Sequence, residues 1–194
     1  MRIGLIADTH MPGSIKELWP QVFHLFQGVD CILHAGDLHT LDIVDELSKI
    51  APTYVARGNG DAGLVDDRLQ ETWFLEFSDV SIGMIHQFPS PARKSSEAIF
   101  RYVDKHFAER PRVLVYGHTH LEGMHHVKDM LCVNPGSPTL PRNQSIRHGT
   151  IGLLEIHQEH VETTIYQLSD NATEVHETVP PTQFSRGVTA NMAL

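Results

Sequence analysis

The sequence places side chains that can bind metals in pairs, two residues apart, directly after two apolar runs. Asp8 and His10 follow the run at residues 2–7, and His118 and His120 follow the run at residues 112–117. Each run is typical of a buried strand. Residues i and i+2 of an extended backbone point to the same side, so each pair can offer two ligands to one point.

Three further polar residues, Asp37, Asn59 and His86, stand in the same way just beyond apolar runs. Each has an ordinary explanation when taken alone. An Asp after a strand often caps the next segment, and an Asn between glycines is common in tight turns. Carboxylate, imidazole and amide groups gathered at several strand ends favour a metal site that performs chemistry.

Composition limits the classes of protein and partner. The chain has 194 residues, which suits one domain with a full core. Lys and Arg total 15 against 24 Asp and Glu, a net charge of −9, so an extended nucleic-acid-binding surface is not expected. No apolar run is long enough to span a membrane and no signal-peptide pattern is present. Cys31 and Cys132 lie in apolar runs and are predicted to be reduced core residues, which favours a cytoplasmic location.

The first third of the sequence alternates between strand and helix patterns. Strands are predicted at residues 2–7, 30–35 and 53–56. One helix is expected to start near Ser14, kinked or restarted at Pro20, and a second to run from a Thr40 cap to Lys49. A βαβαβ start implies parallel strands joined by right-handed crossovers.

The second part of the sequence is dominated by hairpin patterns. Hairpins are predicted at residues 73–86, 125–133 and 150–168, with a helix at 96–109 and a strand at 113–116. These elements suggest a second, partly antiparallel sheet packed on the first, with helices outside both. Residues 169–194 are polar and without clear periodicity, so they are expected to form a loose C-terminal tail, a possible arm for docking a partner.

A glycine pattern offers a competing interpretation. Gly58, Gly60 and Gly63 match the Gly-x-Gly-x-x-Gly fingerprint of dinucleotide-binding proteins. That fingerprint requires a helix opening at its end, and here Asp61 and the following acidic residues would repel a pyrophosphate. A nucleotide-binding regulator is therefore the weakest of the functional hypotheses.

The ordered motifs resemble those of the calcineurin-like metallophosphoesterases. They are Asp8-Thr9-His10, Gly36-Asp37, Gly58-Asn59, His86 and Gly117-His118-Thr119-His120. Their spacing is most similar to that of the small single-domain phosphodiesterases of bacteria and archaea, as is the stretch Asn134-Pro135-Gly136-Ser137. The resemblance covers residues 1–168 and implies an α/β (α+β) fold, a four-layer α-β-β-α sandwich with two mixed β-sheets.

The resemblance also implies a set of metal ligands. Asp8, His10, Asp37 and His120 would bind one ion, and Asp37, Asn59, His86 and His118 a second, with Asp37 bridging and Asp37 and Asn59 taking part in catalysis. Two ions about 4 Å apart can hold a bridging hydroxide that attacks the phosphorus of a small phosphodiester. Mixed imidazole and carboxylate ligands suit Mn²⁺, the expected metal, or Fe²⁺, Ni²⁺ or Zn²⁺, whereas Mg²⁺ prefers oxygen donors.

The sequence departs from the family pattern at Gly60. Many relatives have a His directly after the Asn, where it is thought to protonate the leaving group. Without an assigned general acid, we expect phosphodiesters with good leaving groups to be preferred over alkyl monoesters. The alternative function is a non-catalytic interaction scaffold of the same fold, as in the small retromer subunit, and assembly into homo-oligomers is a further expectation from relatives.

Overall fold

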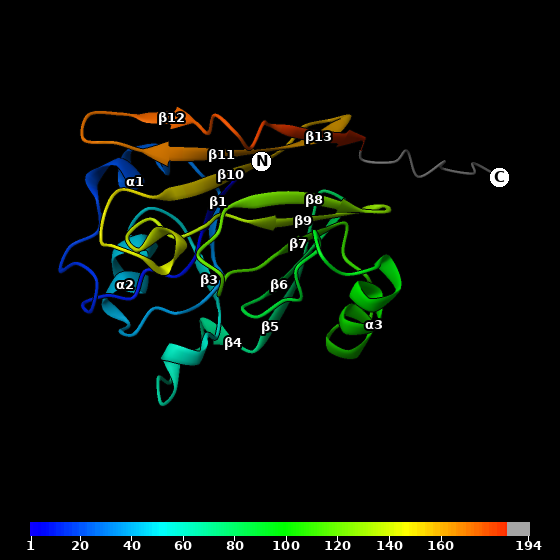
Figure 1. Cartoon of the computed structure of the whole chain (residues 1–194), viewed down its shortest axis with the longest axis horizontal. Helices are drawn as coiled ribbons and strands as arrows, with labels where there is room; N and C mark the ends of the chain where they lie inside the picture. The colour runs from blue at the N-terminus through cyan, green and yellow to red at the C-terminus, as the bar shows by residue number, and fades with distance from the viewer. Residues whose placement is uncertain (186–194) are drawn as a thin grey trace.

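A computed structural model of the chain describes residues 1–185, which form two stacked β-sheets with helices on their outer faces (Figure 1). The first sheet has eight strands in the order β12-β11-β10-β1-β2-β3-β4, and β13 also pairs with β11. Strands β1 to β4 run parallel, while β10 is antiparallel to β1. The strands are β1 (Arg2–Ile6), β2 (Cys31–His34), β3 (Thr53–Ala56), β4 (Leu69–Gln70), β10 (Thr150–Ile156), β11 (His160–Leu168), β12 (Thr173–Val175) and β13 (Thr182–Ser185).

The second sheet has five strands in the order β5-β6-β7-β9-β8. Its three central strands are parallel, and the two edge strands, β5 and β8, are antiparallel to their neighbours. Both sheets are therefore mixed, as predicted. The strands are β5 (Thr72–Phe77), β6 (Val80–Ile85), β7 (Val113–Val115), β8 (Gly123–Val127) and β9 (Met130–Asn134).

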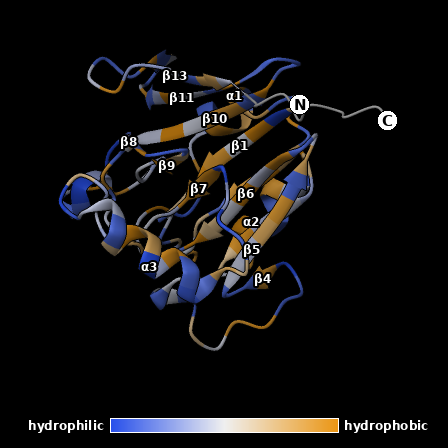
Figure 2. Cartoon of the chain, turned by 90° about the vertical axis from the view of Figure 1, so that its right-hand side faces the viewer, coloured by the Kyte–Doolittle hydropathy of each residue, from blue (hydrophilic) through white to orange (hydrophobic). Residues whose placement is uncertain are grey.

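Three apolar cores separate four layers. The core between the sheets contains Leu5, Leu33 and Val115. Helices α1 (Pro20–Leu25) and α2 (Asp42–Ser48) cover the outer face of the first sheet, and α3 (Ser96–His106) covers that of the second. In Figure 2 the central strands are coloured mainly hydrophobic, while α3 carries hydrophilic residues on its outside. The predicted four-layer sandwich is confirmed.

The alternation of side chains in β1 explains why the strand is apolar from Ile3 to Ile6. Leu5 faces the core between the sheets, whereas Ile6 faces the core beneath α1 and α2. A strand that is buried on both faces must be apolar at every position, not at every second one. The same holds for β2, where Leu33 and Ile32 face opposite cores.

The helix starts agree only in part with the sequence prediction. The first helix begins at Pro20, where a restart was one of the two predicted alternatives, and the helical segment expected from Ser14 is absent, since the Ser14 hydroxyl donates a hydrogen bond to the carbonyl of Thr9 at 2.6 Å. Proline suits the first position of a helix because its missing N–H has no partner to lose there. The second helix has Leu41 at its N-cap without a side-chain hydrogen bond, so the predicted Thr40 cap is wrong.

Residues 169–185 are more ordered than the expected loose tail. Both β12 and β13 pair antiparallel with the outer edge of β11, β12 at one end and β13 at the other. Short polar strands at a sheet edge bury little side-chain area, so their sequence lacks the apolar pattern that reveals a central strand. The proposed boundary at residue 168 stays a prediction, and the remainder of the tail, residues 186–194, lies outside the described residues.

Other expectations from composition can be compared with the structure. Cys31 and Cys132 are both buried free thiols, as predicted. Over residues 1–185, the structure has no helix that is both long and apolar enough to cross a membrane. The predicted cytoplasmic location stays a prediction.

Candidate metal centre

The polar residues that follow five different strands meet at one edge of the stacked sheets. The loops after β1, β2 and β3 come from the first sheet, and those after β6 and β7 come from the second. Carboxyl ends of parallel strands lie at the same edge of a sheet, which is where the ligand sites of α/β folds form. The structure brings together all seven side chains predicted from the sequence, which are Asp8, His10, Asp37, Asn59, His86, His118 and His120.

These side chains form two clusters that share one residue. In cluster 1, one ligand atom from each residue lies within 4.8 Å of every other, and its members are Asp8, His10, Asp37 and His120. Cluster 2 meets the same limit with Asp37, His86 and His118. Asn59 joins cluster 2 because its Oδ1 lies 3.1 Å from Nε2 of His86 and 3.0 Å from Nδ1 of His118.

The carboxylate of Asp37 lies between the two clusters. Its Oδ2 is 3.4 Å from Nε2 of His10, and its Oδ1 is 3.5 Å from Nε2 of His86. The backbone N–H of Gly60 donates to Oδ1 at 2.7 Å, which fixes the orientation of the carboxylate. Each oxygen of Asp37 therefore faces a different group of imidazoles.

Backbone carbonyls orient two of the imidazoles. Nδ1 of His86 donates to the carbonyl of Ala35 at 2.7 Å, and Nδ1 of His120 donates to the carbonyl of Leu140 at 2.8 Å. A carbonyl only accepts, so the proton must be on Nδ1 and the neutral ring presents the lone pair of Nε2 to the cluster. This is the arrangement in which a second partner sets the tautomer of a metal-binding histidine.

The lone pairs in the clusters face one another. Nε2 of His86 and Oδ1 of Asn59 are both acceptors, yet they lie 3.1 Å apart. Oδ1 of Asp8 is 3.7 Å from the Nε2 lone pair of His120. Facing lone pairs repel each other unless a cation lies among them. Carboxylate oxygens, amide oxygens and imidazole nitrogens are ligands that divalent transition metals accept. The residues present fit a metal ion in each cluster.

Burial sets the protonation of the clusters. It raises the pKa of Asp8 well above the ordinary value, and the nearby carboxylate of Asp37 raises it further. Burial also lowers the pKa of His10 to about 4 and lowers the pKa values of His86 and His120. Neutral imidazole is the form that binds metals, so the fold favours the binding-competent state of these rings at neutral pH.

The backbone is strained at most of these positions. Five of the seven residues have φ in the left-handed region, at 53° for Asp8, 48° for His10, 58° for Asp37, 69° for His118 and 53° for His120. This conformation is unfavourable for residues other than glycine, and it clusters at functional sites. The two pairs are therefore not in the extended backbone that the sequence predicted, and His118 and His120 lie in different clusters and not at one point. The left-handed turns direct these side chains into the site.

Asp61 is a positioning residue that the sequence analysis did not identify as part of the site. Its buried carboxylate accepts four backbone N–H groups from two loops, those of Asp37, Leu38, His39 and Gly58, at 2.7–3.0 Å. Burial by itself raises the pKa of Asp61, but these hydrogen bonds lower it below the ordinary value. Its position three residues after Gly58, where an acidic side chain can reach back to backbone N–H groups, was the available signal.

The stretch Asn134-Pro135-Gly136-Ser137 supports the first loop from behind. Ser137 Oγ donates to the carbonyl of Asp8 at 2.7 Å, and Thr139 Oγ1 donates to that of Thr9 at 2.8 Å. Asn134 Nδ2 donates to the carbonyl of Gly117 at 3.0 Å, immediately before His118. One segment thus holds the loops that follow β1 and β7.

Other polar residues near the site take structural positions. His34 is buried and hydrogen-bonded to Thr9 and to the N–H of Gly36. Arg57 pairs with Glu71, and Arg142 pairs with Glu122. The Gly58-Asn59-Gly60 stretch leads into a 3-10 turn and then β4, not into the α-helix of a dinucleotide fingerprint.

The imidazole of His39 fills the space beside Gly60. A Cβ atom at Gly60 would lie 2.4 Å from Nε2 of His39, and the His39 ring centre is 4.5 Å from that of His10. A larger residue at position 60 would therefore require His39 to move. The imidazole of His39, on the loop after β2, thus lies where a histidine side chain at position 60 would extend.

Comparison with known proteins defines the class of this chain. The profile of the calcineurin-like phosphoesterase superfamily domain matches residues 1–159. The chain belongs to this family of phosphoesterases. It is 38% identical over 144 residues to a protein of Methanothermobacter thermautotrophicus named "Probable metallophosphoesterase", a match that covers 73% of this chain and 80% of that protein.

Two further relatives bear on function and fold. A protein of Methanocaldococcus jannaschii named as a phosphodiesterase is 26% identical over 145 residues, covering 70% of this chain and 83% of that protein. The structure of Vacuolar Protein Sorting 29 from Cryptosporidium parvum superposes with a TM-score of 0.77 at 20% identity and covers 95% of this chain and 97% of that one. At this identity, the superposition shows the shared fold alone.

Proposed function

We propose that this chain is a phosphodiesterase that binds two divalent transition-metal ions, one in each cluster. The observation that carries the proposal is the position of Asp37, whose two carboxylate oxygens face different clusters at 3.4 and 3.5 Å from the nearest imidazole nitrogens. A carboxylate shared in this way suits a pair of adjacent ions. Mn²⁺ is the expected metal, with Fe²⁺, Ni²⁺ and Zn²⁺ compatible with the same donors.

The ions, when bound, would lower the pKa of a shared water and neutralise charge on the reacting phosphoryl group. The chain's own residues orient the reactants. Asp8, Asp37 and His120 are buried and fix the floor of the site, whereas Asn59 and His118 are exposed and lie where a substrate phosphate would enter. The Nδ2 of Asn59 is a donor at the open side of cluster 2, available to an oxygen of the phosphodiester.

A diester is favoured over a monoester for two reasons. Gly60 supplies no side chain to protonate an alcohol leaving group, so the site suits substrates whose leaving group departs without strong general acid help. One relative is itself named a phosphodiesterase. A small phosphodiester is the proposed substrate, and the acidic net charge makes a long nucleic acid a poor one.

Metal content and turnover test the proposal together. Protein stripped with a chelator and reloaded with Mn²⁺ is expected to bind two ions per chain and to hydrolyse bis(4-nitrophenyl) phosphate faster than 4-nitrophenyl phosphate, and chelation should abolish turnover. Protein that binds no ion, or that binds two and hydrolyses neither ester, would contradict it.

The alternative is an interaction scaffold of the same fold, supported by the likeness to a Vacuolar Protein Sorting 29 structure. Both clusters have a complete set of metal-binding side chains whose lone pairs face one another. This favours the enzyme, because a scaffold has no need of strained, buried ligand groups. Assembly into homo-oligomers stays a proposal. The molar mass of the purified chain, measured by size-exclusion chromatography with light scattering, tests it.

A further inference from the structure

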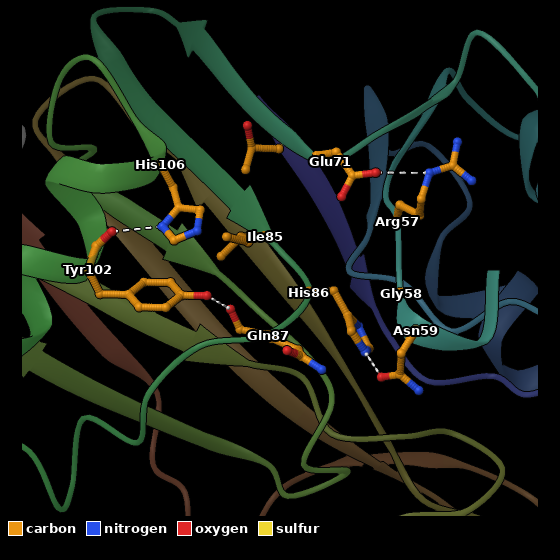
Figure 3. A pocket seen from close by; sticks show the side chains of 10 residues that line it. Arg57, Gly58, Asn59, Glu71, Ile85, His86, Gln87, Tyr102 and His106 are labelled. Atoms are coloured by element: carbon orange, nitrogen blue, oxygen red, sulfur yellow. Dashed lines mark hydrogen bonds and ion pairs between the residues drawn. The ribbon is translucent and has the colours of Figure 1, made fainter. Parts of the chain in front are cut away.

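A pocket of about 300 Å³ opens directly beside cluster 2 (Figure 3). Asn59 and His86 form part of its wall, so any molecule whose phosphate reaches cluster 2 can extend into it. Its other walls come from α3 and from the start of β5 and the end of β6 in the second sheet. The pocket is therefore placed to bind one of the two alcohol arms of a phosphodiester.

One wall of the pocket is aromatic and rigid. The rings of Tyr102 and His106, both on α3, are stacked with centres 4.3 Å apart and planes 26° apart. The Tyr102 hydroxyl donates to the carbonyl of Gln87 at 3.0 Å, and Nδ1 of His106 donates to the carbonyl of Tyr102 at 2.9 Å. Because one polar atom of each ring donates to a backbone carbonyl, the wall needs little ordering before a flat ring packs against it.

The opposite wall carries charges that balance each other. Arg57 Nε is 3.2 Å from Oε1 of Glu71, and Nη1 of Arg57 donates to two backbone carbonyls, at 3.2 and 2.8 Å. Figure 3 shows this pair across the pocket from Tyr102 and His106. Among the residues that line the pocket, the one permanent cation is thus already paired, which suits a neutral group better than a second phosphate.

Polar groups complete the pocket without adding charge. The exposed amide of Gln87 offers both donors and an acceptor, and Glu71, 82% exposed in its side chain, keeps an oxygen free of Arg57. A flat, neutral ring with alternating donors and acceptors at its edge matches this combination of an aromatic wall and a polar rim. Nucleobases have that chemistry, and they stack on aromatic side chains.

We propose that this pocket binds the nucleoside arm of the phosphodiester, with Tyr102 and His106 as specificity-determining residues. The inference rests on the proposed function, since it assigns a substrate class to the same site. A second hollow, lined by His10, His39 and Ile146, opens on the side of cluster 1. It has no Tyr, Trp or Phe among its lining residues, so we assign it to the alcohol that leaves in the reaction.

Two substrates with one leaving group test the proposal. Thymidine 5′-(4-nitrophenyl phosphate) and ethyl 4-nitrophenyl phosphate both release 4-nitrophenolate, so the ratio of their kcat/KM values reports the nucleoside arm alone. The wild-type protein is expected to favour the thymidine diester. Tyr102→Ala should lower the ratio about 10-fold, because it removes one ring of the stacked aromatic pair against which the base packs, and Tyr102→Phe should retain it.

Controls separate specificity from folding. Tyr166→Ala removes a partly buried tyrosine on β11 of the other sheet and should keep the wild-type ratio. If Tyr102→Ala fails to fold, Gln87→Ala replaces it, since this exposed side chain is not part of a core, and it should lower the ratio several-fold. An equal loss on both substrates would assign Tyr102 a structural role and overturn the proposal.

A binding experiment keeps this inference distinct from the proposed hydrolase activity. Thymidine itself, added to chelator-treated protein, should give saturation-transfer NMR signals that weaken in Tyr102→Ala. Hydrolysis of both diesters with no preference and no thymidine signal would overturn the pocket assignment and leave the phosphodiesterase intact. Thymidine binding without hydrolysis of either diester would contradict the phosphodiesterase and leave the pocket assignment supported.

Discussion

The two halves of the candidate metal centre differ in how deeply they are set into the protein. In cluster 1, Asp8 is fully buried and His120 is 2% exposed, and the Asn134–Ser137 stretch backs the loop that carries Asp8. In cluster 2, His86 is as buried as His120, but His118 and Asn59 are exposed, and the pocket beside Tyr102 opens next to them, whereas His10 is the one partly exposed residue of cluster 1. The difference predicts that cluster 1 is the fixed part of the candidate site and that cluster 2 is the part that meets the proposed substrate.

The shared carboxylate offers the largest test of this division. Asp37→Asn removes the charge that faces both clusters, so it should impair both ions and lower kcat/KM by more than about 100-fold, the upper range for a partner outside the ligands themselves. The metal-free variant should unfold at no lower temperature than the wild type, because the repulsion between Asp37 and Asp8 is relieved. Steady-state kinetics, metal analysis and calorimetry measure these effects. Loss of one ion alone would show that the clusters do not share Asp37.

Single histidine variants should distinguish the halves. His120→Ala, in the buried half, should remove activity with only a modest effect on folding, and added Mn²⁺ should not restore it. His118→Ala, in the exposed half, should leave one tightly held ion and regain part of its activity as Mn²⁺ is raised. Metal titrations followed by activity make the comparison. Identical metal dependence of the two variants would contradict a fixed half and an open half.

Acidification should destabilise the protein through a group behind the fixed half. Burial lowers the pKa of His34 to about 4 from 6.5. The neutral ring is hydrogen-bonded to the N–H of Gly36 and to the hydroxyl of Thr9. The unfolded chain takes up this proton first, so the stabilisation is complete above pH 6.5 and is lost as the pH falls towards 4. Between pH 7 and 4, the metal-free protein should lose about 3 kcal/mol more stability than His34→Asn. Urea unfolding at several pH values measures this, and parallel curves for the two proteins would exclude His34 as the cause.

The smallest expected effect comes from the support behind Asp8. Ser137→Ala removes the hydrogen bond to the Asp8 carbonyl and should cost about 1–2 kcal/mol of stability together with roughly 10-fold in kcat/KM. Ser169→Ala, which removes a comparable hydrogen bond in the turn before β12, is the matched control and should leave activity unchanged. Equal activity of the two variants would show that the segment behind cluster 1 supports the fold but not the site.

The sequence predicted the strands and the convergent polar side chains of this site better than the residues that support them. Residues such as Leu5 and Leu33 lie in strands buried on both faces, and continuous apolar runs reveal such strands directly. Asp8 and His118 were identifiable because a polar side chain at the end of such a run stands out. The resemblance to a known family then supplied their grouping as metal ligands, which stays a prediction, although the members of each group lie close together in the structure.

Other features depend on contacts that no local pattern encodes. Asp61 acts through backbone groups of another loop, and Ser137 reaches a carbonyl 129 residues away in the chain. The pocket wall at Tyr102 requires α3 to lie beside β6, which helix periodicity alone does not determine. The helical segment predicted from Ser14 to Pro20 was wrong because Ser14 has capping-box spacing, but its hydroxyl donates to the carbonyl of Thr9.

The strands after residue 168 also affect how copies of this chain can associate. An unpaired sheet edge is a template on which another chain can add a strand. Here β12 and β13 divide the outer edge of β11 between them, with the N–H of His176 bonded to the carbonyl of Ile165 where they part. A second copy could pair with β11 only after β12 and β13 had detached from it. Self-association through the edge of β11 would therefore be coupled to local unfolding of residues 173–185.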